Sequence, residues 1–180
     1  ERERKIRDLL EAPAKEYGDE DGWLEFFDYT IHHDGDGVLD ISFRVSGVGA
    51  YPSSSSSHLT IDLASGERIT AKQAFRSDRR AELAQRVDRE VQKAWREAME
   101  AQKESADEEA PDLGEAPHFV VENLDDFLVL DEGVVFRFDF GFPHAIEAAT
   151  PNSEFLIPRA EIAGFLRPQG PLGWMRGARH

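Results

Sequence analysis

The sequence contains no cysteine in its 180 residues, which excludes disulfide bonds and thiol chemistry. It also has no apolar run approaching the roughly 18 residues that a transmembrane helix requires, so we expect no membrane insertion within it. Basic residues are few: 21 lysines and arginines stand against 36 aspartates and glutamates, a formal net charge of −15. Nucleic acids and anionic lipids are negative too, so we expect neither as a partner, and the charge favours a basic one.

Length and local composition predict one domain with an extension at each end. A chain of 180 residues can bury a core without metal ions or disulfide bonds. Residues 1–22 are expected to form a helix, ended by Pro13, and an acidic linker. Residues 23–166 form the domain, and residues 167–180, rich in glycine and proline, form a frayed tail. The first residue is Glu1, so any signal peptide or membrane anchor is expected upstream.

The first part of the domain has the pattern of antiparallel strands. Aromatic and β-branched residues fill positions 23–31, and Asp34-Gly35-Asp36-Gly37 has the composition of a hairpin turn. The return strand alternates apolar residues with polar ones such as Asp40, which we expect to point outward to solvent. Five serines, Ser53 to Ser57, then predict a flexible loop.

The clearest helical pattern lies between Ser77 and Glu104. Its apolar residues recur at every fourth position: Leu83, Val87, Val91, Trp95 and Met99. This spacing predicts a long helix that buries Trp95 against a sheet. The segments expected after it are an acidic loop over residues 105–117, a strand over 118–122, a hairpin over 127–138, a strand over 154–158 and a short helix over 159–166. The predicted fold is α+β: an antiparallel β-sheet with one long helix packed on one face and a short C-terminal helix.

None of the polar clusters has the spacing of a known catalytic or metal site. His32 and His33 are neighbours in a predicted strand and so point to opposite faces, which prevents them from sharing one ion. The serines beside His58 lack the Gly-x-Ser-x-Gly motif of a hydrolase nucleophile. Carboxylates between Glu122 and Glu132 are close together because acidic residues are abundant, which is no sign of a glycosidase pair. We therefore expect no catalytic residue, no metal ion, no cofactor and no enzymatic activity.

The aromatic residues fall into two groups according to their neighbours. Those in the predicted strands and long helix are expected in the core: Trp23, Phe26, Phe27, Phe43, Trp95, Phe136 and Phe138. Tyr51, Phe142 and Trp174 lie beside glycine and proline in loops, where an exposed ring can anchor a partner. We select Tyr51, Phe142 and His144 as candidate binding residues, the histidine because it follows a proline in the same aromatic loop.

Several short segments occur in an order that carries a family resemblance. They are Ala50-Tyr51, Thr60-Ile61-Asp62-Leu63 with Gly66, Ile69 to Phe75, Phe127 to Phe138, and Ile157-Pro158 with Ile162 and Leu166. From Val48 to Leu166 the chain resembles the C-terminal domain family found in the extracellular part of RsiV-type anti-sigma factors and at the end of some peptidoglycan deacetylases. It departs from that family after Tyr51, where Pro52 and the serines replace a Gly-Gly-Ala-His-Pro-like stretch.

The resemblance implies a periplasmic or extracellular domain with a sensing or binding role and no catalysis. In the anti-sigma members the ligand is lysozyme, a strongly basic protein. We therefore expect a monomeric domain of the bacterial cell envelope that binds a basic protein, with lysozyme as first candidate, or a cell-wall component. The alternative is an accessory module of a peptidoglycan-modifying hydrolase, and an enzyme whose site the sequence does not reveal is a third possibility.

Overall fold

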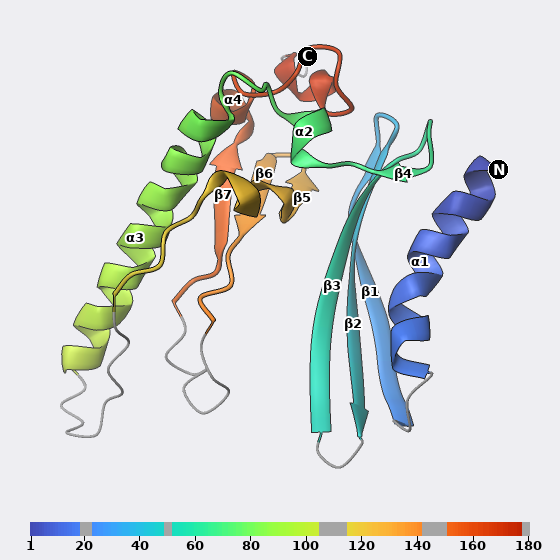
Figure 1. Ribbon diagram of the computed structural model, residues 1–180, viewed down its shortest axis with the longest axis horizontal. Helices are drawn as coiled ribbons and strands as arrows, with labels where there is room; N and C mark the ends of the chain where they lie inside the picture. Colours follow the sequence, from blue (N-terminus) through green and yellow to red (C-terminus); the bar gives the residue numbers. More distant parts are fainter. Residues whose placement is uncertain (19–22, 49–51, 105–114, 142–150, 178–180) are drawn as a thin grey trace.

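The chain folds into two antiparallel sheets that meet at one end, as Figure 1 shows. The computed structural model describes residues 1–18, 23–48, 52–104, 115–141 and 151–177. Strands β1 to β4 form the first sheet in sequence order, and β5 to β7 form the second. The predicted α+β class with antiparallel strands is confirmed, although the strands divide into two sheets where we expected one. Within the described ranges, none of the helices combines the length and the apolar character needed to cross a membrane.

The first sheet is built on a long hairpin. Its strands are β1 (Trp23–Gly35), β2 (Val38–Val48), β3 (Pro52–Asp62) and β4 (Glu67–Arg68). At the tip of the hairpin, Asp36 and Gly37 both have positive φ, 52° and 79°. A two-residue turn that matches the twist of its strands requires this conformation, which aspartate and glycine adopt most readily. The predicted hairpin turn is therefore confirmed.

The predicted flexible loop of serines is wrong, because Ser53 to Ser57 belong to β3. They pair with β2 in continuous antiparallel register, from Gly47 opposite Ser53 to Phe43 opposite Ser57. This ladder gives the backbone N–H and C=O groups of alternate serines hydrogen-bond partners on β2. Cross-strand pairing thus outweighs the local preference of serine for turns.

Helix α1 (Arg2–Gly18) contacts β1 and β2. The predicted end at Pro13 is wrong, since the helix continues to Gly18. The proline removes only one backbone donor from the helix. It is flanked by Ala12 and Ala14, and alanine is the strongest helix former, so these neighbours favour continuation of the helix.

The first sheet buries the apolar residues of β2 and β3 whose side chains lie on the face opposite Asp40: Ile41, Phe43, Val45 and Ile61.

The second sheet carries the long helix. Its strands are β5 (Phe127–Leu130), β6 (Gly133–Arg137) and β7 (Glu154–Pro158). The helical segments around it are α2 (Ala71–Ala74), α3 (Arg80–Glu104), η1 (Val121–Asp125), α4 (Arg159–Ile162) and η3 (Gly173–Arg176). Helix α3 lies along this sheet and contacts β7 and η1 (Figure 1).

The predicted apolar stripe of the long helix is confirmed in its position. Leu83, Val87 and Val91 are fully buried, Trp95 is 6% exposed, and Met99 is half-buried near the end of the helix. The first three belong to the main apolar core, which also contains residues from all three strands of the second sheet. The indole of Trp95 stacks on Phe140 with a centroid distance of 5.8 Å.

The predicted strand over residues 118–122 is wrong. This segment enters the helical turn η1, and its backbone groups bond locally or to α3. The Phe119 N–H donates to Asp88 Oδ1 on α3 at 2.8 Å, and the Val120 N–H donates to Asn123 Oδ1 at 2.8 Å. Side-chain acceptors therefore replace the neighbouring strand that an extended segment would need.

The predicted frayed tail is also wrong over its described part, residues 167–177. Leu172 and Met175 are 0% and 1% exposed and belong to the main core. Arg159 at the start of α4 holds this segment, because its guanidinium donates to the carbonyl oxygens of Trp174 and Met175, both at 3.0 Å. Two buried side chains and these bonds offset the flexibility expected from the glycines and prolines.

We predict that Trp95→Ala lowers the free energy of unfolding by about 3–5 kcal/mol, because it empties a buried aromatic site beside Phe140. Chemical denaturation followed by circular dichroism measures this value. The exposed neighbour Arg96 provides the control, since Arg96→Ala should change the stability by no more than about 0.5 kcal/mol. Equal stability of the two variants would show that the stripe does not hold α3 on the sheet.

Candidate functional site

A buried carboxylate joins the two sheets. Asp40 on β2 is 0% exposed, which contradicts its predicted position facing solvent. Its Oδ2 accepts the backbone N–H of Val129 on β5 at 2.9 Å and the hydroxyl of Thr60 at 2.7 Å. His58 Nε2 lies 3.2 and 3.3 Å from its two oxygens. A buried carboxylate needs hydrogen-bond donors from the protein, and those of Asp40 come from both sheets. Asp40 is therefore a structural joint between the first and second sheets.

His58 is the polar residue of this joint that reaches toward the space between the sheets. Its side chain is 3% exposed, and in the tautomer with hydrogen on Nε2 it donates to the Asp40 carboxylate. The other ring nitrogen, Nδ1, has no hydrogen-bond partner among the described residues, and Asp126 Oδ1 lies 3.9 Å away. Ser57 precedes it in β3 and, by strand alternation, faces the opposite side of the sheet. The Thr60 hydroxyl lies 3.5 Å from Nε2 but donates to Asp40, so in the described part of the chain no hydroxyl stands at Nδ1, where a catalytic triad would need its nucleophile.

A second histidine fixes the same end of the molecule. His33 on β1 is 7% exposed, and its Nδ1 lies 3.2 Å from Asp131 Oδ1 in the turn between β5 and β6. Its ring stacks on Trp174 of η3 at 4.8 Å with an interplanar angle of 9°. His32 turns elsewhere and bonds Ser42 Oγ at 2.7 Å, so the two adjacent histidines serve different contacts. Across the described ranges, no three histidines or carboxylates come together as a metal site.

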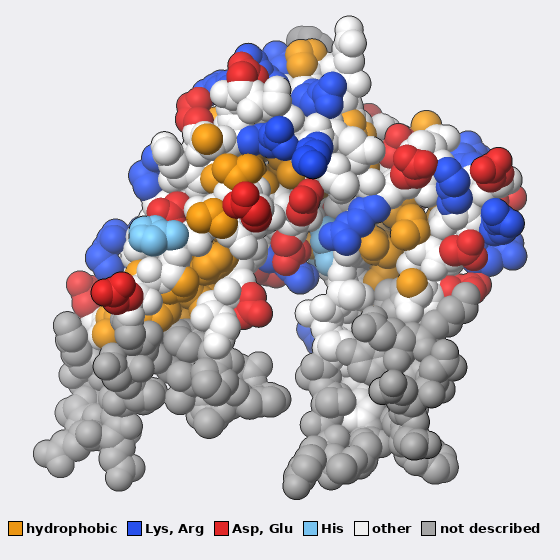
Figure 2. All heavy atoms as spheres, in the orientation of Figure 1, with side chains coloured by type: hydrophobic (Ala, Val, Ile, Leu, Met, Phe, Trp, Pro, Cys, Tyr) orange, Lys and Arg blue, Asp and Glu red, His pale blue; other side chains and the backbone are white. Residues whose placement is uncertain are grey.

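Below this joint, two adjoining grooves of about 480 and 270 Å³ open between the sheets. Figure 2 shows the hollow between the part of the molecule that carries α3 with the second sheet and the part that carries the first sheet. Volumes of this order fall in or near the range of about 300–1,000 Å³ typical of ligand sites. We call the two together the cleft. Its charged lining residues are Asp28, Arg44, Arg68, Glu122, Asp125, Asp126, Arg137, Asp139 and Glu154.

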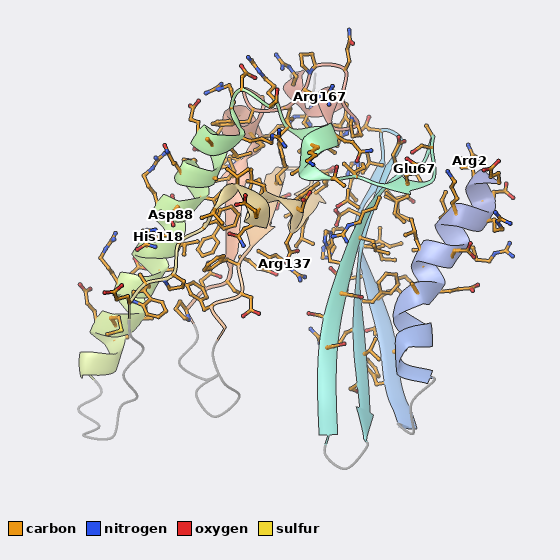
Figure 3. The ribbon with its side chains drawn as sticks, in the orientation of Figure 1. Arg2, Glu67, Asp88, His118, Arg137 and Arg167 are labelled. Atoms are coloured by element: carbon orange, nitrogen blue, oxygen red, sulfur yellow. The ribbon has the colours of Figure 1, made fainter. Side chains whose placement is uncertain are left out.

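Carboxylates predominate in the cleft, and part of its charge is already neutralised. Arg137 on β6 lines both grooves and is directed toward the space between the sheets in Figure 3. Its Nε lies 3.2 Å from Asp126 Oδ1. Asp125 Oδ1 accepts the backbone N–H of Ala71 at 2.6 Å and so holds the start of α2. Glu122 and Glu154 are exposed, so they can meet a ligand directly.

A third feature is the apolar surface of β1. Phe26, Phe27, Tyr29 and Ile31 are 47%, 37%, 57% and 49% exposed. The prediction that Phe26 and Phe27 belong to the core is therefore wrong. β1 is the edge strand of its sheet, and the apolar burial on that face is concentrated on β2, where Phe43 is 4% exposed. Strand alternation predicts which side chains share a face, but not how far a neighbouring element covers that face.

The binding residues selected from the sequence, Tyr51, Phe142 and His144, lie outside the described residues. Asp40 was expected to face solvent and His58 was considered only as a neighbour of the serines, so the sequence did not indicate that the two residues pair. In the observed register, Asp40 lies opposite Thr60 and Ser42 lies opposite His58, which gathers polar side chains on one face. That register becomes visible only when the serine segment is recognised as a strand.

Fold and cleft together define an α+β domain with two sheets and a polar, mainly acidic cleft between them. No family model and no curated protein match the sequence. The structure is similar to that of a DUF3298 family member from Bacteroides fragilis, with a TM-score of 0.51 and 16% identity over 94% of this chain and 64% of that one. It is also similar to a DUF3298 family protein from Pseudomonas aeruginosa, with a TM-score of 0.52 and 14% identity over 88% of this chain and 70% of that one.

These similarities concern the fold. The chain spans 64% of the length of the Bacteroides fragilis protein, so parts of that protein have no counterpart in the match. At 14% and 16% identity, neither structure assigns a role to an individual side chain of this chain. The cleft and β1 must therefore be interpreted from their own chemistry.

We predict that Asp40→Ala lowers the free energy of unfolding by about 3–5 kcal/mol. Removing a buried, hydrogen-bonded carboxylate leaves its donors buried without an acceptor. The Val129 N–H, the Thr60 hydroxyl and His58 Nε2 would each lose an acceptor. Urea denaturation measures the change, with the exposed Glu100→Ala on α3 as a control for loss of one carboxylate. A stability equal to that of the control would contradict the role of Asp40 as the joint.

Proposed function

We propose that this chain is a non-catalytic binding domain of the bacterial cell envelope and that its ligand is a basic protein. The observation that carries this proposal is the acidic cleft between the sheets. Carboxylates on both walls, such as Asp28 on β1 and Glu154 on β7, face a space large enough to receive part of a ligand. The net charge of −15 adds a long-range attraction for a positively charged partner.

The chemistry of the buried histidine supports binding over catalysis. His58 is oriented by Asp40, as in a catalytic dyad, but Nδ1 faces Asp126 at 3.9 Å instead of a hydroxyl. Asp40 itself is engaged by donors from two strands besides His58. These polar groups therefore serve the junction between the sheets, and the cleft below them offers charge without an activated nucleophile in the described residues.

The envelope location and the choice of lysozyme rest on the sequence resemblance to the RsiV-like C-terminal domain family. The likeness of fold to two DUF3298 proteins is compatible with that family. Lysozyme is strongly basic, so its charge complements the cleft. We propose a monomeric domain, periplasmic or extracellular, in which electrostatic steering brings the partner in and a smaller set of direct contacts gives specificity.

We predict that lysozyme binds with micromolar or tighter affinity and that neutralising the cleft weakens the complex by about three- to ten-fold, the range expected for two exposed charges. The cleft variant is Glu122→Gln with Glu154→Gln, one substitution in each groove. The matched control is Glu97→Gln with Glu100→Gln, which makes the same charge change on the exposed side of α3. Isothermal titration calorimetry at low and high salt measures the affinities.

The comparison separates a specific site from general attraction. Exposed charges further apart than about 8 Å are screened at physiological ionic strength, so a complex held by charge alone disappears in high salt. A specific complex persists there and responds more to the cleft variant than to the control. Equal weakening by both variants, or equal binding of another basic protein such as cytochrome c, would refute the proposed function.

A further inference from the structure

Strand β1 concentrates the exposed apolar side chains of the molecule. Four of the seven large apolar residues that are exposed in the described part of the chain lie on it, within Phe26 to Ile31. Within the described residues β1 pairs with β2 alone, so no strand there is hydrogen-bonded to its other edge. It is also 13 residues long, whereas about 5–6 is the commonest strand length. A long edge strand with exposed apolar residues is suited to pairing with a strand of another chain.

The middle of β1 lacks several of the usual protections of an edge strand. Soluble proteins block such edges with lysine, proline, short strands, β-bulges or a covering helix, and in β1 the register shifts lie near the ends, while helix α1 contacts both β1 and β2. The sequence of β1, from Trp23 to Gly35, contains no lysine, arginine or proline. The register shifts near each end, between Leu24 and Phe26 and between Ile31 and His33, leave a regular stretch between them. The exposed apolar residues lie within that stretch.

One face of this stretch forms half of an apolar stripe. Phe27, Tyr29 and Ile31 alternate along β1 and lie opposite three residues of β2: Val45, Phe43 and Ile41. The β2 residues are at most 6% exposed, whereas those of β1 are at least 37% exposed. The rings of Phe27 and Phe43 are 5.7 Å apart, so the stripe is continuous across the two strands. An added strand with an apolar residue at every second position would extend the stripe and bury its outer row.

The other face selects the charge of the added strand. Asp28, Thr30 and His32 alternate with the apolar residues and line the cleft. Every formally charged side chain in the sequence of β1 is a carboxylate, and Asp36 in the following turn adds another. A second copy of this chain would bring a charge of −15 against the same sign, which disfavours self-association. A basic side chain in an added strand would instead lie beside Asp28, on the side away from its cross-strand neighbour Arg44.

We propose that β1 binds an extended, basic segment of the partner protein as an additional strand of the first sheet. Backbone hydrogen bonds along the free edge supply affinity, and alternation of apolar and basic side chains supplies specificity. This inference rests on the proposed function for the identity of the partner as a basic protein. It assigns the contact to the edge of β1, with the cleft as the neighbouring acidic surface.

The test uses a synthetic peptide of alternating lysine and valine, as long as β1, and lysozyme in parallel. Amide hydrogen exchange followed by NMR reports which strand gains protection. We expect the lysine–valine peptide to slow exchange in β1 and not in β7, the corresponding edge of the second sheet. A peptide of alternating glutamate and valine is the matched probe, and it should bind at least about ten-fold more weakly because its charge is reversed.

Substitutions on the two edges provide the matched variants. Tyr29→Lys and Ile31→Lys each place a charge in the exposed row of β1 and should weaken the peptide at least about ten-fold, because a lysine on an edge opposes strand addition. Leu156→Lys on β7, which is 42% exposed in the native chain, should leave the affinity unchanged. All three positions are exposed, so each variant should fold, and circular dichroism checks that it does.

Four outcomes are informative. Peptide protection of β1 that Tyr29→Lys removes supports the inference, even if lysozyme does not bind and the proposed function fails in that form. Lysozyme binding with no change in β1 exchange overturns the inference and leaves the proposed function standing. Equal binding of the two peptides overturns the basic character of the partner. Protection of β1 that rises with protein concentration and needs no peptide shows that a second copy occupies the edge, which also overturns it.

Discussion

The buried carboxylate of Asp40 is the constraint on which the arrangement of the two sheets depends. Among the strands that the structure describes, none of one sheet pairs with a strand of the other, so no backbone ladder between them holds these strands together. Asp40 crosses this gap by accepting the Val129 N–H, and it is held in place by Thr60 and His58 from β3. His33 and Asp131 make a second polar contact between the same sheets. The cleft opens beside these contacts, and His58 is one of its lining residues.

The distribution of apolar residues explains what remains exposed. The main core lies between α3, the second sheet and the C-terminal segment, where Leu172 and Met175 complete it. The first sheet buries a smaller set on β2 and β3, including Phe43 and Ile61. β1 lies at the edge of that set, and its Phe26, Phe27 and Tyr29 are 47%, 37% and 57% exposed. The exposed apolar row of β1 therefore marks the edge of the buried part of the first sheet. The same strand also borders the acidic cleft.

Acidic and apolar surfaces contribute differently to recognition. Net charge acts over distances comparable to the Debye length and accelerates encounter, but it discriminates poorly between basic partners. Apolar residues act only at contact, and anchors such as exposed aromatic rings account for much of the free energy of a complex. This molecule brings the two together, since Tyr29 and Asp28 are neighbours on one strand. A ligand chosen by both must be basic and also carry apolar side chains at strand spacing.

Local rules determined several elements from the sequence alone. The Asp-Gly turn was predictable because two successive positive φ angles suit few other residues, and α3 was predictable because its apolar residues follow the helical period. The α+β class follows from those elements. The tertiary structure alone decided the division into two sheets, the pairing of Ser53 to Ser57, the burial of Asp40 and the exposure of β1. Each of these depends on which residues far apart in sequence become neighbours, and alternation along a strand is the same whether a given face meets protein or water.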